Sequence, residues 1–371
     1  MNCRFCQSAC REYLTYRDIP ARSQHFPEHP AKDGITLNVV QCTGCGLIQL
    51  DNEPVSYFRE VIRAVGVSPE MAALRRKQFA DFARRHQLLG QKVLETGCGN
   101  GDYLHLIQSS GMDAYGTEYG DIPRQEKVEK IYFETGKERH SAGPFAGFFL
   151  LNWLEHIPAP RPFLDGIRNN LRPNAAGLVE VPNYDMIFEK KMFAEFTIDH
   201  LYYFTASTLR TALETNGFEV LSMQETFHRY ILSCEVRLRQ LPGPEPFVKA
   251  ENALYQSIDD FIHSHHSDGN CAVWGAGHQS LLMLSLAPVL KNHICRVLDS
   301  ASFKQGKYTP ATGLPICSPE SLHDGTIATV LVIAGGYSEE IVRILQKDYP
   351  EVRHIGILRE DGVEYVPAKL L

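Results

Sequence analysis

The sequence lacks the features that would commit the chain to a membrane or to nucleic acid. No apolar run approaches the roughly 18 residues that cross a bilayer, and the chain opens with Met-Asn-Cys-Arg rather than with a leader-like basic and apolar stretch. Positive charge is not in excess, since 37 Lys and Arg stand against 44 Asp and Glu and leave a formal charge of −7. Surfaces that coat nucleic acid or anionic lipid need a basic excess. We therefore expect a cytoplasmic protein that binds a small molecule, with no membrane or nucleic-acid partner.

Short repeats, low-complexity tracts and coiled-coil heptads are also absent from the sequence. The 371 residues are 44% hydrophobic, which is ordinary globular material and enough for two or three domains. The oligomeric state is left open by the sequence.

Cysteine is scarce except at the start of the chain, where five of the ten cysteines fall within the first 45 residues. Two C-x-x-C pairs stand out there, and two such pairs can complete a tetrahedral shell of four thiolates around zinc. Four thiolates leave no open position, so we predict a structural zinc ion. A redox C-x-x-C and an iron–sulfur cluster are the alternatives, and Cys10 lies outside the pattern. The predicted ligands are Cys3, Cys6, Cys42 and Cys45.

The stretch VLETGCGNG, residues 93 to 101, organises the rest of the chain. A short apolar run ends in Glu95, glycines follow at alternate positions, and a helical pattern begins at Tyr103. Glycine lets a ligand lie against the backbone and permits positive φ. A second predicted strand, 113 to 117, ends in Glu118, whose carboxylate could accept hydrogen bonds from both hydroxyls of a ribose. NAD-type dinucleotides and S-adenosylmethionine both fit this plan.

The spacing of the glycines distinguishes between these two candidate ligands. Dinucleotide folds usually show G-x-G-x-x-G and face a pyrophosphate, which an acid as close to the turn as Glu95 would repel. The pattern resembles motif I of class I S-adenosylmethionine-dependent methyltransferases, with Glu118 in the place of their ribose-binding acid. A structural glycine turn in another doubly wound fold is the alternative. The predicted cofactor residues are Glu95, Gly97, Gly99, Asn100, Gly101, Glu118 and Asn152.

Polar residues also follow a third predicted strand. Strand 145 to 151 is followed by Asn152, Glu155 and His156, and ligands of open parallel sheets sit at such carboxyl ends. Asn152 and His156 are spaced to share one face of a helical turn, although His156 could equally cap a helix. We predict a helix over 161 to 171 that ends before Pro173, then a strand over 177 to 181.

Two helices are predicted before the glycine stretch, over residues 53 to about 90. Ser68 is the candidate N-cap of the second, with Pro69 at its first position. Helices in this position often cover a cofactor pocket. Arg59 and Arg63 would then face that pocket, or else form a solvated helix face.

The segment Asp-His-Leu-Tyr-Tyr-Phe, residues 199 to 204, sharpens the resemblance. It is similar to the Glu-His-Leu-x-Tyr-Phe motif of the sugar C-methyltransferases, which act on nucleotide-linked keto-sugars in deoxysugar and antibiotic pathways. Those enzymes also carry an N-terminal four-cysteine zinc domain and a distinctive C-terminal domain. Asp199 stands where the family has Glu, and Ala311 replaces a glycine of the C-terminal Lys-Gln-Gly-x-x-x-Pro-Gly pattern.

The resemblance covers nearly the whole chain and implies an α/β fold with three parts. Residues 1–52 would form the zinc-binding domain, and 53–240 a Rossmann-like class I methyltransferase domain with N-terminal lid helices. Residues 241–371 would form a second Rossmann-like α/β domain, which opens after the proline-rich stretch 241–247. There Gly275 and Gly277 repeat the strand, glycine turn and helix, either as a second nucleotide seat or as a wall of the substrate cleft.

Methylation of a carbon beside a ketone requires removal of a proton and stabilisation of the enolate. His200, which matches the motif histidine, is the predicted general base, with Asp199 as its polar support. His156 and Asn152 would stabilise the enolate oxygen or orient the sugar, and Tyr202 would hydrogen-bond it.

Three other functions compete with this one. The same architecture could methylate an oxygen, nitrogen or aromatic carbon of another small molecule. A non-catalytic assembly module and an NAD-dependent dehydrogenase are the remaining alternatives.

Overall fold

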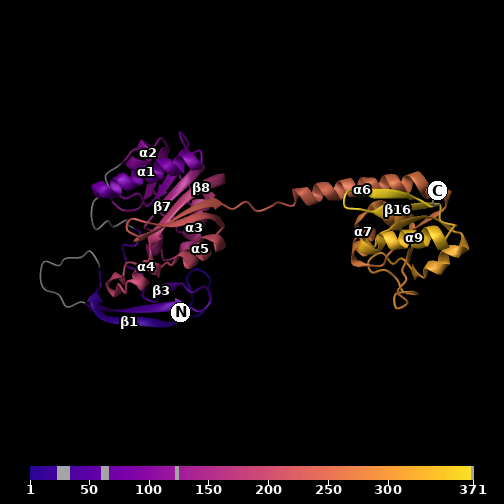
Figure 1. The fold of residues 1–371 in the computed structure, drawn as a ribbon, viewed down its shortest axis with the longest axis horizontal. Coiled ribbons are helices and arrows are strands. Elements are labelled where there is room, and N and C mark those ends of the chain that lie inside the picture. The colour runs from indigo at the N-terminus through magenta and orange to yellow at the C-terminus, as the bar shows by residue number, and fades with distance from the viewer. Residues whose placement is uncertain (23–33, 60–66, 122–124, 369–371) are drawn as a thin grey trace. The chain divides into compact units, whose positions relative to one another are not determined.

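A computed structural model describes residues 1–22, 34–59, 67–121 and 125–368 of the chain. The described residues form two compact units, Met1–Leu241 and Pro242–Leu371 (Figure 1). No helix among them is long and apolar enough to cross a membrane.

The first unit is built on a seven-stranded sheet in which five neighbouring strands are parallel. Parallel pairing places the carboxyl ends of these strands at one edge, and β11 then runs antiparallel between β8 and β10. The strand order is β10 (Phe218–Thr226), β11 (Ile231–Leu238), β8 (Leu171–Pro182), β7 (Phe145–Leu151), β4 (Lys92–Thr96), β5 (Asp113–Glu118), β6 (Val128–Lys130).

Helices cover both faces of this sheet. On one face, Phe79 and Phe82 of α1 (Pro69–Arg85) pack edge-on against Phe149 of β7, with ring centroids 5.2 and 5.4 Å apart. The short α2 (Asp102–Ser109) joins the same hydrophobic cluster. On the other face, α3 (Pro160–Asn169) and α5 (Ala206–Thr215) contribute to the larger core. The predicted layered α/β fold is confirmed.

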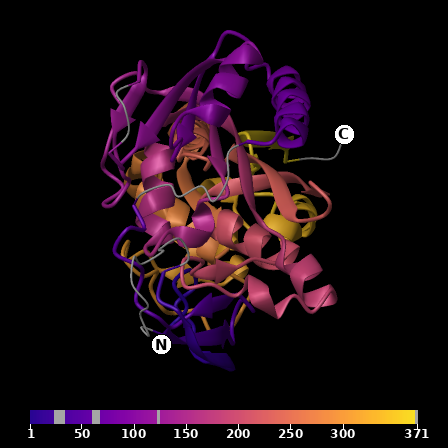
Figure 2. The same cartoon turned by 90° about the vertical axis from the view of Figure 1, so that its left-hand side faces the viewer.

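A small four-stranded sheet carries the N-terminal cysteines and lies at one end of the first unit (Figures 1 and 2). Its order is β1 (Cys10–Pro20), β2 (Gly34–Cys42), β3 (Ile48–Leu50), β9 (Tyr202–Tyr203). Ile48 pairs with Tyr203, so the segment that follows His200 supplies the last strand of the cysteine-bearing sheet. The segment predicted as a zinc domain is thereby built into the first unit.

The helix over 161–171 was predicted too long. α3 ends at Asn169, and Leu171 already pairs with Phe145 in the sheet. Asn170 makes this sharp exit possible, because its side chain accepts from the His140 amide at 2.8 Å and donates to the Gly166 carbonyl at 2.8 Å.

The helices predicted before the glycine stretch are also only partly observed. The second begins as predicted, since the Ser68 hydroxyl accepts from the Met71 amide at 3.1 Å, although α1 ends at Arg85 rather than near 90. Of the first, residues 56–59 form a turn, while 60–66, including Arg63, lie outside the described residues.

The second unit contains a six-stranded sheet of the same Rossmann-like kind. Its central β12 pairs in parallel with β13 on one side and β15 on the other, which creates a topological switch point. The order is β14 (Ile316–Cys317), β13 (Ile294–Leu298), β12 (Asn270–Trp274), β15 (Ile327–Val332), β16 (His354–Leu358), β17 (Val363–Pro367). The helices of this unit are α6 (Glu245–His265), α7 (His278–Leu286), α8 (Pro288–His293) and α9 (Ser338–Asp348).

Candidate active site and four-cysteine cluster

The glycine turn after β4 has a backbone that glycine alone adopts without strain. Gly97, Gly99 and Gly101 have φ of 69°, 53° and 82°, and a Cβ on Gly97 would lie 2.0 Å from the Trp153 ring. The Gly97 amide donates to the Thr117 carbonyl at 2.9 Å, which ties the turn to β5. The turn therefore lacks side chains at three alternate positions and is fixed to the neighbouring strand.

Glu118 lies at the tip of β5 against this turn. Its carboxylate accepts hydrogen bonds from the amides of Gly99, Tyr119 and Gly120, each at 2.8 Å. Three backbone donors orient a buried carboxylate beside the turn. Glu95 is buried within β4, and Asn100 is exposed on the turn.

The end of β7 brings the next predicted residue to the same edge. Asn152 has a φ of 50°, and its amide donates to the Glu180 carbonyl of β8 at 2.9 Å. Its side-chain oxygen is buried and accepts no hydrogen bond from the described residues. Trp153 follows and covers Gly97.

Two predicted histidines, 44 positions apart in the sequence, meet next to this edge. His156 closes the 3-10 helix Leu154–His156, and its ring lies edge-on to that of His200 with centroids 4.8 Å apart. The Leu201 amide donates to the Glu155 carbonyl at 2.7 Å, and His156 Nδ1 donates to the Asp199 carbonyl at 2.7 Å. These two hydrogen bonds hold the segments together.

Burial sets the protonation of this group of residues. It lowers the pKa of His200 to about 3, and it lowers the pKa of His156 despite the opposing hydrogen bond to the Asp199 carbonyl. Burial also raises the pKa of the Glu155 carboxyl to about 8. Near neutral pH the two imidazoles are therefore uncharged.

Two expected roles do not match the geometry. The Asp199 carboxylate accepts from the Tyr57 hydroxyl at 2.6 Å, so its observed partner is Tyr57 and not His200. The Tyr202 hydroxyl donates to the Ile157 carbonyl at 2.9 Å, and its ring packs edge-on against Phe5 at 5.1 Å. Tyr202 is buried, and it belongs to the core that joins the seven-stranded sheet to the cysteine-bearing sheet.

Glu155 is a site residue to which the sequence analysis gave no role. It precedes His156 at a strand end, which is a signal for a site, but an acid at the start of a helical turn is usually solvated. Only the packing shows that this carboxylate is 1% exposed.

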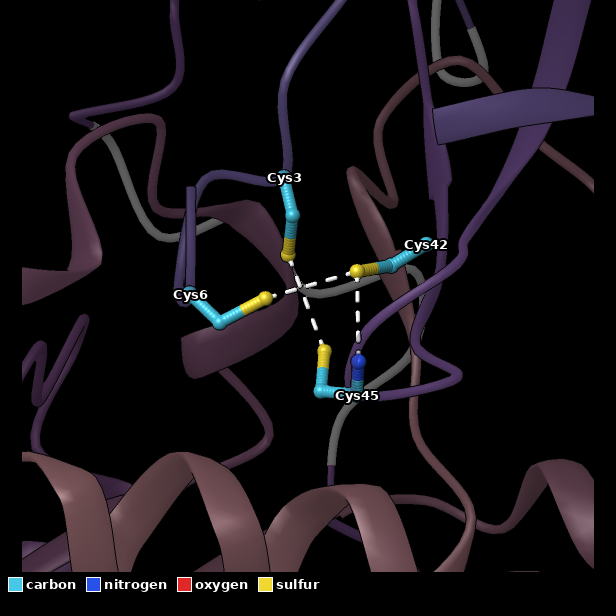
Figure 3. Close-up of side chains that lie close together, drawn as sticks. All are labelled: Cys3, Cys6, Cys42 and Cys45. Atoms are coloured by element: carbon cyan, nitrogen blue, oxygen red, sulfur yellow. Dashed lines mark hydrogen bonds between the residues drawn. The ribbon is translucent and has the colours of Figure 1, made fainter. Parts of the chain in front are cut away.

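The four predicted metal ligands converge on one point (Figure 3). Cys3 Sγ lies 3.8 Å from Cys45 Sγ, and Cys6 Sγ lies 3.4 Å from Cys42 Sγ. A tetrahedron with Zn–S bonds of about 2.3 Å has sulfur-to-sulfur edges of about 3.8 Å. The amides of Gly44 and Cys45 donate to Cys42 Sγ, each at 3.3 Å. The geometry fits one tetrahedral thiophilic ion.

The environments of the four thiols differ, because burial raises the pKa of Cys3 and of Cys45. Burial raises the pKa of Cys6, but hydrogen bonds from Ser8 and Cys42 outweigh burial and bring it to about 6. Cys10 stays outside the cluster, as expected: it accepts from the Gln49 amide nitrogen at 3.3 Å, and burial raises its pKa to about 11.

The second unit has its own glycine turn at the carboxyl end of β12. Gly275 has a φ of 119°, and a Cβ there would lie 2.4 Å from the Ile333 carbonyl oxygen. The Asp299 carboxylate accepts from the Ala276 amide and from Lys304 Nζ, each at 2.8 Å. A cavity of about 550 Å³ adjoins these residues. Ala311, in the position of the expected glycine, has a φ of 65°.

Comparisons with known proteins match both halves of this description. Residues 67–223 match the family of methyltransferase domains, and residues 235–352 match the C-methyltransferase C-terminal domain. The C-methyltransferase NovU of Streptomyces niveus is 24% identical over 383 residues, which cover 92% of this chain and 91% of NovU. The ubiquinone biosynthesis O-methyltransferase of Acinetobacter baumannii (strain AYE) is 27% identical over 100 residues, 23% of this chain and 41% of that enzyme.

Among solved structures, the 1,6-didemethyltoxoflavin-N1-methyltransferase of Burkholderia thailandensis is similar to 53% of this chain, over 98% of its own, with a TM-score of 0.36 and 15% identity. Sequence motifs, fold and family matches together define an S-adenosylmethionine-dependent methyltransferase. More specifically, the chain belongs to the C-methyltransferases in which a methyltransferase domain is followed by the C-methyltransferase C-terminal domain.

Proposed function

We propose that this enzyme methylates a carbon beside the ketone of a nucleotide-linked sugar, through an enolate. The observation that carries the proposal is the contact between the uncharged rings of His156 and His200 next to the carboxyl edge of the parallel sheet. The match of residues 199–204 to the sugar C-methyltransferase motif supports the substrate class.

We further propose that the cofactor lies on the glycine turn. Gly97, Gly99 and Gly101 carry no side chain and hold the turn at positive φ, and the Glu118 carboxylate lies beside them, where it could accept hydrogen bonds from ribose hydroxyls. Glu95, Asn100 and Asn152 complete the proposed seat. When bound, S-adenosylmethionine supplies an electrophilic methyl group.

The chain's own residues must remove the proton and hold the charge that results. His200 is the proposed base, because an uncharged imidazole can accept a proton and the enolate that forms beside it favours the protonated ring. His156 fits the second task less well than expected. Its Nδ1 proton is already donated to the Asp199 carbonyl, so the uncharged ring has no proton left on Nε2 for an enolate oxygen. The side-chain amide of Asn152 remains as an uncharged hydrogen-bond donor.

We also propose that the four-cysteine cluster holds a structural zinc ion, and that residues 1–52, 53–240 and 241–371 act as zinc, catalytic and C-terminal domains. Four thiolates saturate a tetrahedral ion, so this metal would support the fold and take no part in methyl transfer.

The test separates proton removal from methyl transfer. The enzyme is incubated in D₂O with candidate keto-sugar nucleotides and S-adenosylhomocysteine, and deuterium at the carbon beside the ketone is measured by NMR. Methyl uptake is then followed with S-adenosylmethionine. We expect exchange and C-methylation by the wild type and loss of both by His200→Asn, with unchanged S-adenosylhomocysteine affinity. Methylation of an oxygen, a nitrogen or an aromatic carbon instead would refute the proposed substrate class.

A further inference from the structure

We propose that Glu155, His156 and His200 form a binding site for a divalent transition-metal ion, separate from the four-cysteine cluster. One ligand atom from each of the three side chains lies within 4.8 Å of the other two. The inference concerns what this group of residues binds and does not depend on the proposed sugar substrate.

The Glu155 carboxylate is the first reason to expect an ion. The residue is 1% exposed, and its Oε2 accepts no hydrogen bond from any described residue. A buried carboxyl oxygen without a hydrogen-bond partner is costly, and a metal ion that replaced the carboxyl proton would satisfy it. Its Oε1 lies 3.9 Å from His156 Nε2, a separation that one ion could bridge by binding both atoms.

The orientation of His156 is the second reason. Its Nδ1 lies 2.7 Å from the Asp199 carbonyl oxygen, which can only accept, so the ring proton is on Nδ1. The Nε2 lone pair of the uncharged ring then points away from that carbonyl and is available to a ligand. Metal-binding histidines are commonly held in this way, with the second nitrogen donating to a carbonyl.

His200 completes the set from a different segment. Within the described residues its ring makes no hydrogen bond, while its amide donates to the Thr197 carbonyl at 3.3 Å and fixes the backbone. An uncharged imidazole nitrogen without a hydrogen bond is the form of histidine that coordinates metals. The three ligands therefore come from two segments that hydrogen bonds already hold in place.

The donor set indicates which ions fit. Two imidazoles and one carboxylate suit Mn²⁺, Fe²⁺, Co²⁺ or Zn²⁺, and three protein ligands leave positions open for an oxygen of a bound molecule. The lone pair of His200 cannot bind an ion and accept a proton at once, so His200 acts as base only in the ion-free form.

The test uses the full chain loaded with one equivalent of zinc per chain, which the four thiolates take up first, because excess zinc would also fill the proposed site. MnCl₂ is the probe, because Mn²⁺ prefers oxygen and nitrogen to thiolate, and free Mn²⁺ is followed by electron paramagnetic resonance. We expect one Mn²⁺ per chain with the zinc content unchanged, and at least a tenfold loss of affinity in both Glu155→Gln and His200→Asn. The matched control is Glu70→Gln, since Glu70 forms an exposed pair with His228 at 2.8 Å and should leave Mn²⁺ binding intact.

Unchanged S-adenosylhomocysteine binding shows that each variant is folded, and His200→Asn provides a second reading if Glu155→Gln misfolds. The inference is overturned if neither Mn²⁺ nor Co²⁺ binds beyond the cysteine cluster, or if a folded Glu155→Gln binds Mn²⁺ as the wild type does. Binding is measured without substrate. Absence of Mn²⁺ binding would therefore not contradict the proposed methylation, and absence of methylation would not contradict the metal result.

Discussion

The amide of Gly99 donates a hydrogen bond to the carboxylate of Glu118 over 2.8 Å, and so joins the glycine turn to the tip of the neighbouring strand. The contact couples two positions 19 residues apart that the proposed cofactor would touch together. A ligand that displaced either residue would disturb the other.

Replacement of Glu118 should therefore weaken cofactor binding. Hydrogen bonds to a charged group contribute about 1.5–3 kcal/mol, so Glu118→Gln should lower S-adenosylhomocysteine affinity by about 10- to 100-fold in calorimetry. Glu126→Gln, at an exposed position, is the control and should bind like the wild type. Equal affinity of Glu118→Gln and the wild type would remove Glu118 from the proposed seat.

Gly97→Ala should destabilise the first unit. The positive φ of 69° costs a non-glycine residue about 1–2 kcal/mol, and the new Cβ would meet the Trp153 ring. Overpacking adds about 1–3 kcal/mol, so the free energy of unfolding in urea should fall by about 2–5 kcal/mol. Gly277→Ala is the control, because a Cβ at Gly277 meets nothing within 4 Å. Similar stabilities for the two variants would contradict the proposed packing of Trp153.

The stability of the first unit should decrease in acid through Glu235. Burial raises the pKa of this carboxyl, but hydrogen bonds from His86 at 2.8 Å and from Arg85 outweigh it and hold the pKa below its ordinary value of 4.5. A lowered folded-state pKa stabilises the fold above about pH 4.5, and this contribution is lost as the pH falls through the folded value. Glu235→Gln should be less stable at pH 7 and should lose less stability than the wild type between pH 5 and pH 3, as measured by urea unfolding. Parallel pH profiles for the two proteins would show that Glu235 does not titrate with folding.

Removal of the cysteine cluster should affect more than the N-terminal sheet. Phe5, between two of the ligands, packs edge-on against Tyr202 and Phe204 at 5.1 and 5.8 Å, and these residues follow His200. Cys42→Ser should lose the bound zinc, lower the Tm and reduce methyl transfer.

Cys10→Ser is the matched control for this prediction, since Cys10 lies outside the cluster and should keep a full zinc equivalent by elemental analysis. Full zinc content in Cys42→Ser would refute the four-thiolate site.

The strongest local patterns in the sequence determined much of the fold. The apolar run 145–151 is β7 to the residue, the alternating glycines form the predicted turn, and Ser68 caps α1. Each signal is local, because hydrophobic runs, positive φ and capping depend on near neighbours in the chain. The cysteine spacing likewise predicted its cluster, since each C-x-x-C pair converges by itself.

Tertiary structure alone decided how the site residues face one another. The sequence assigned His156 and His200 to one site but could not show that their rings are in contact. It also could not show that the Asp199 carboxylate accepts a hydrogen bond from Tyr57 while the Asp199 carbonyl accepts one from His156. Nor could it show that Glu155 Oε2 is buried with no donor among the described residues, or that Tyr202 faces the core. Side-chain direction and desolvation arise from segments far apart in the chain, so they follow from packing and not from any local pattern.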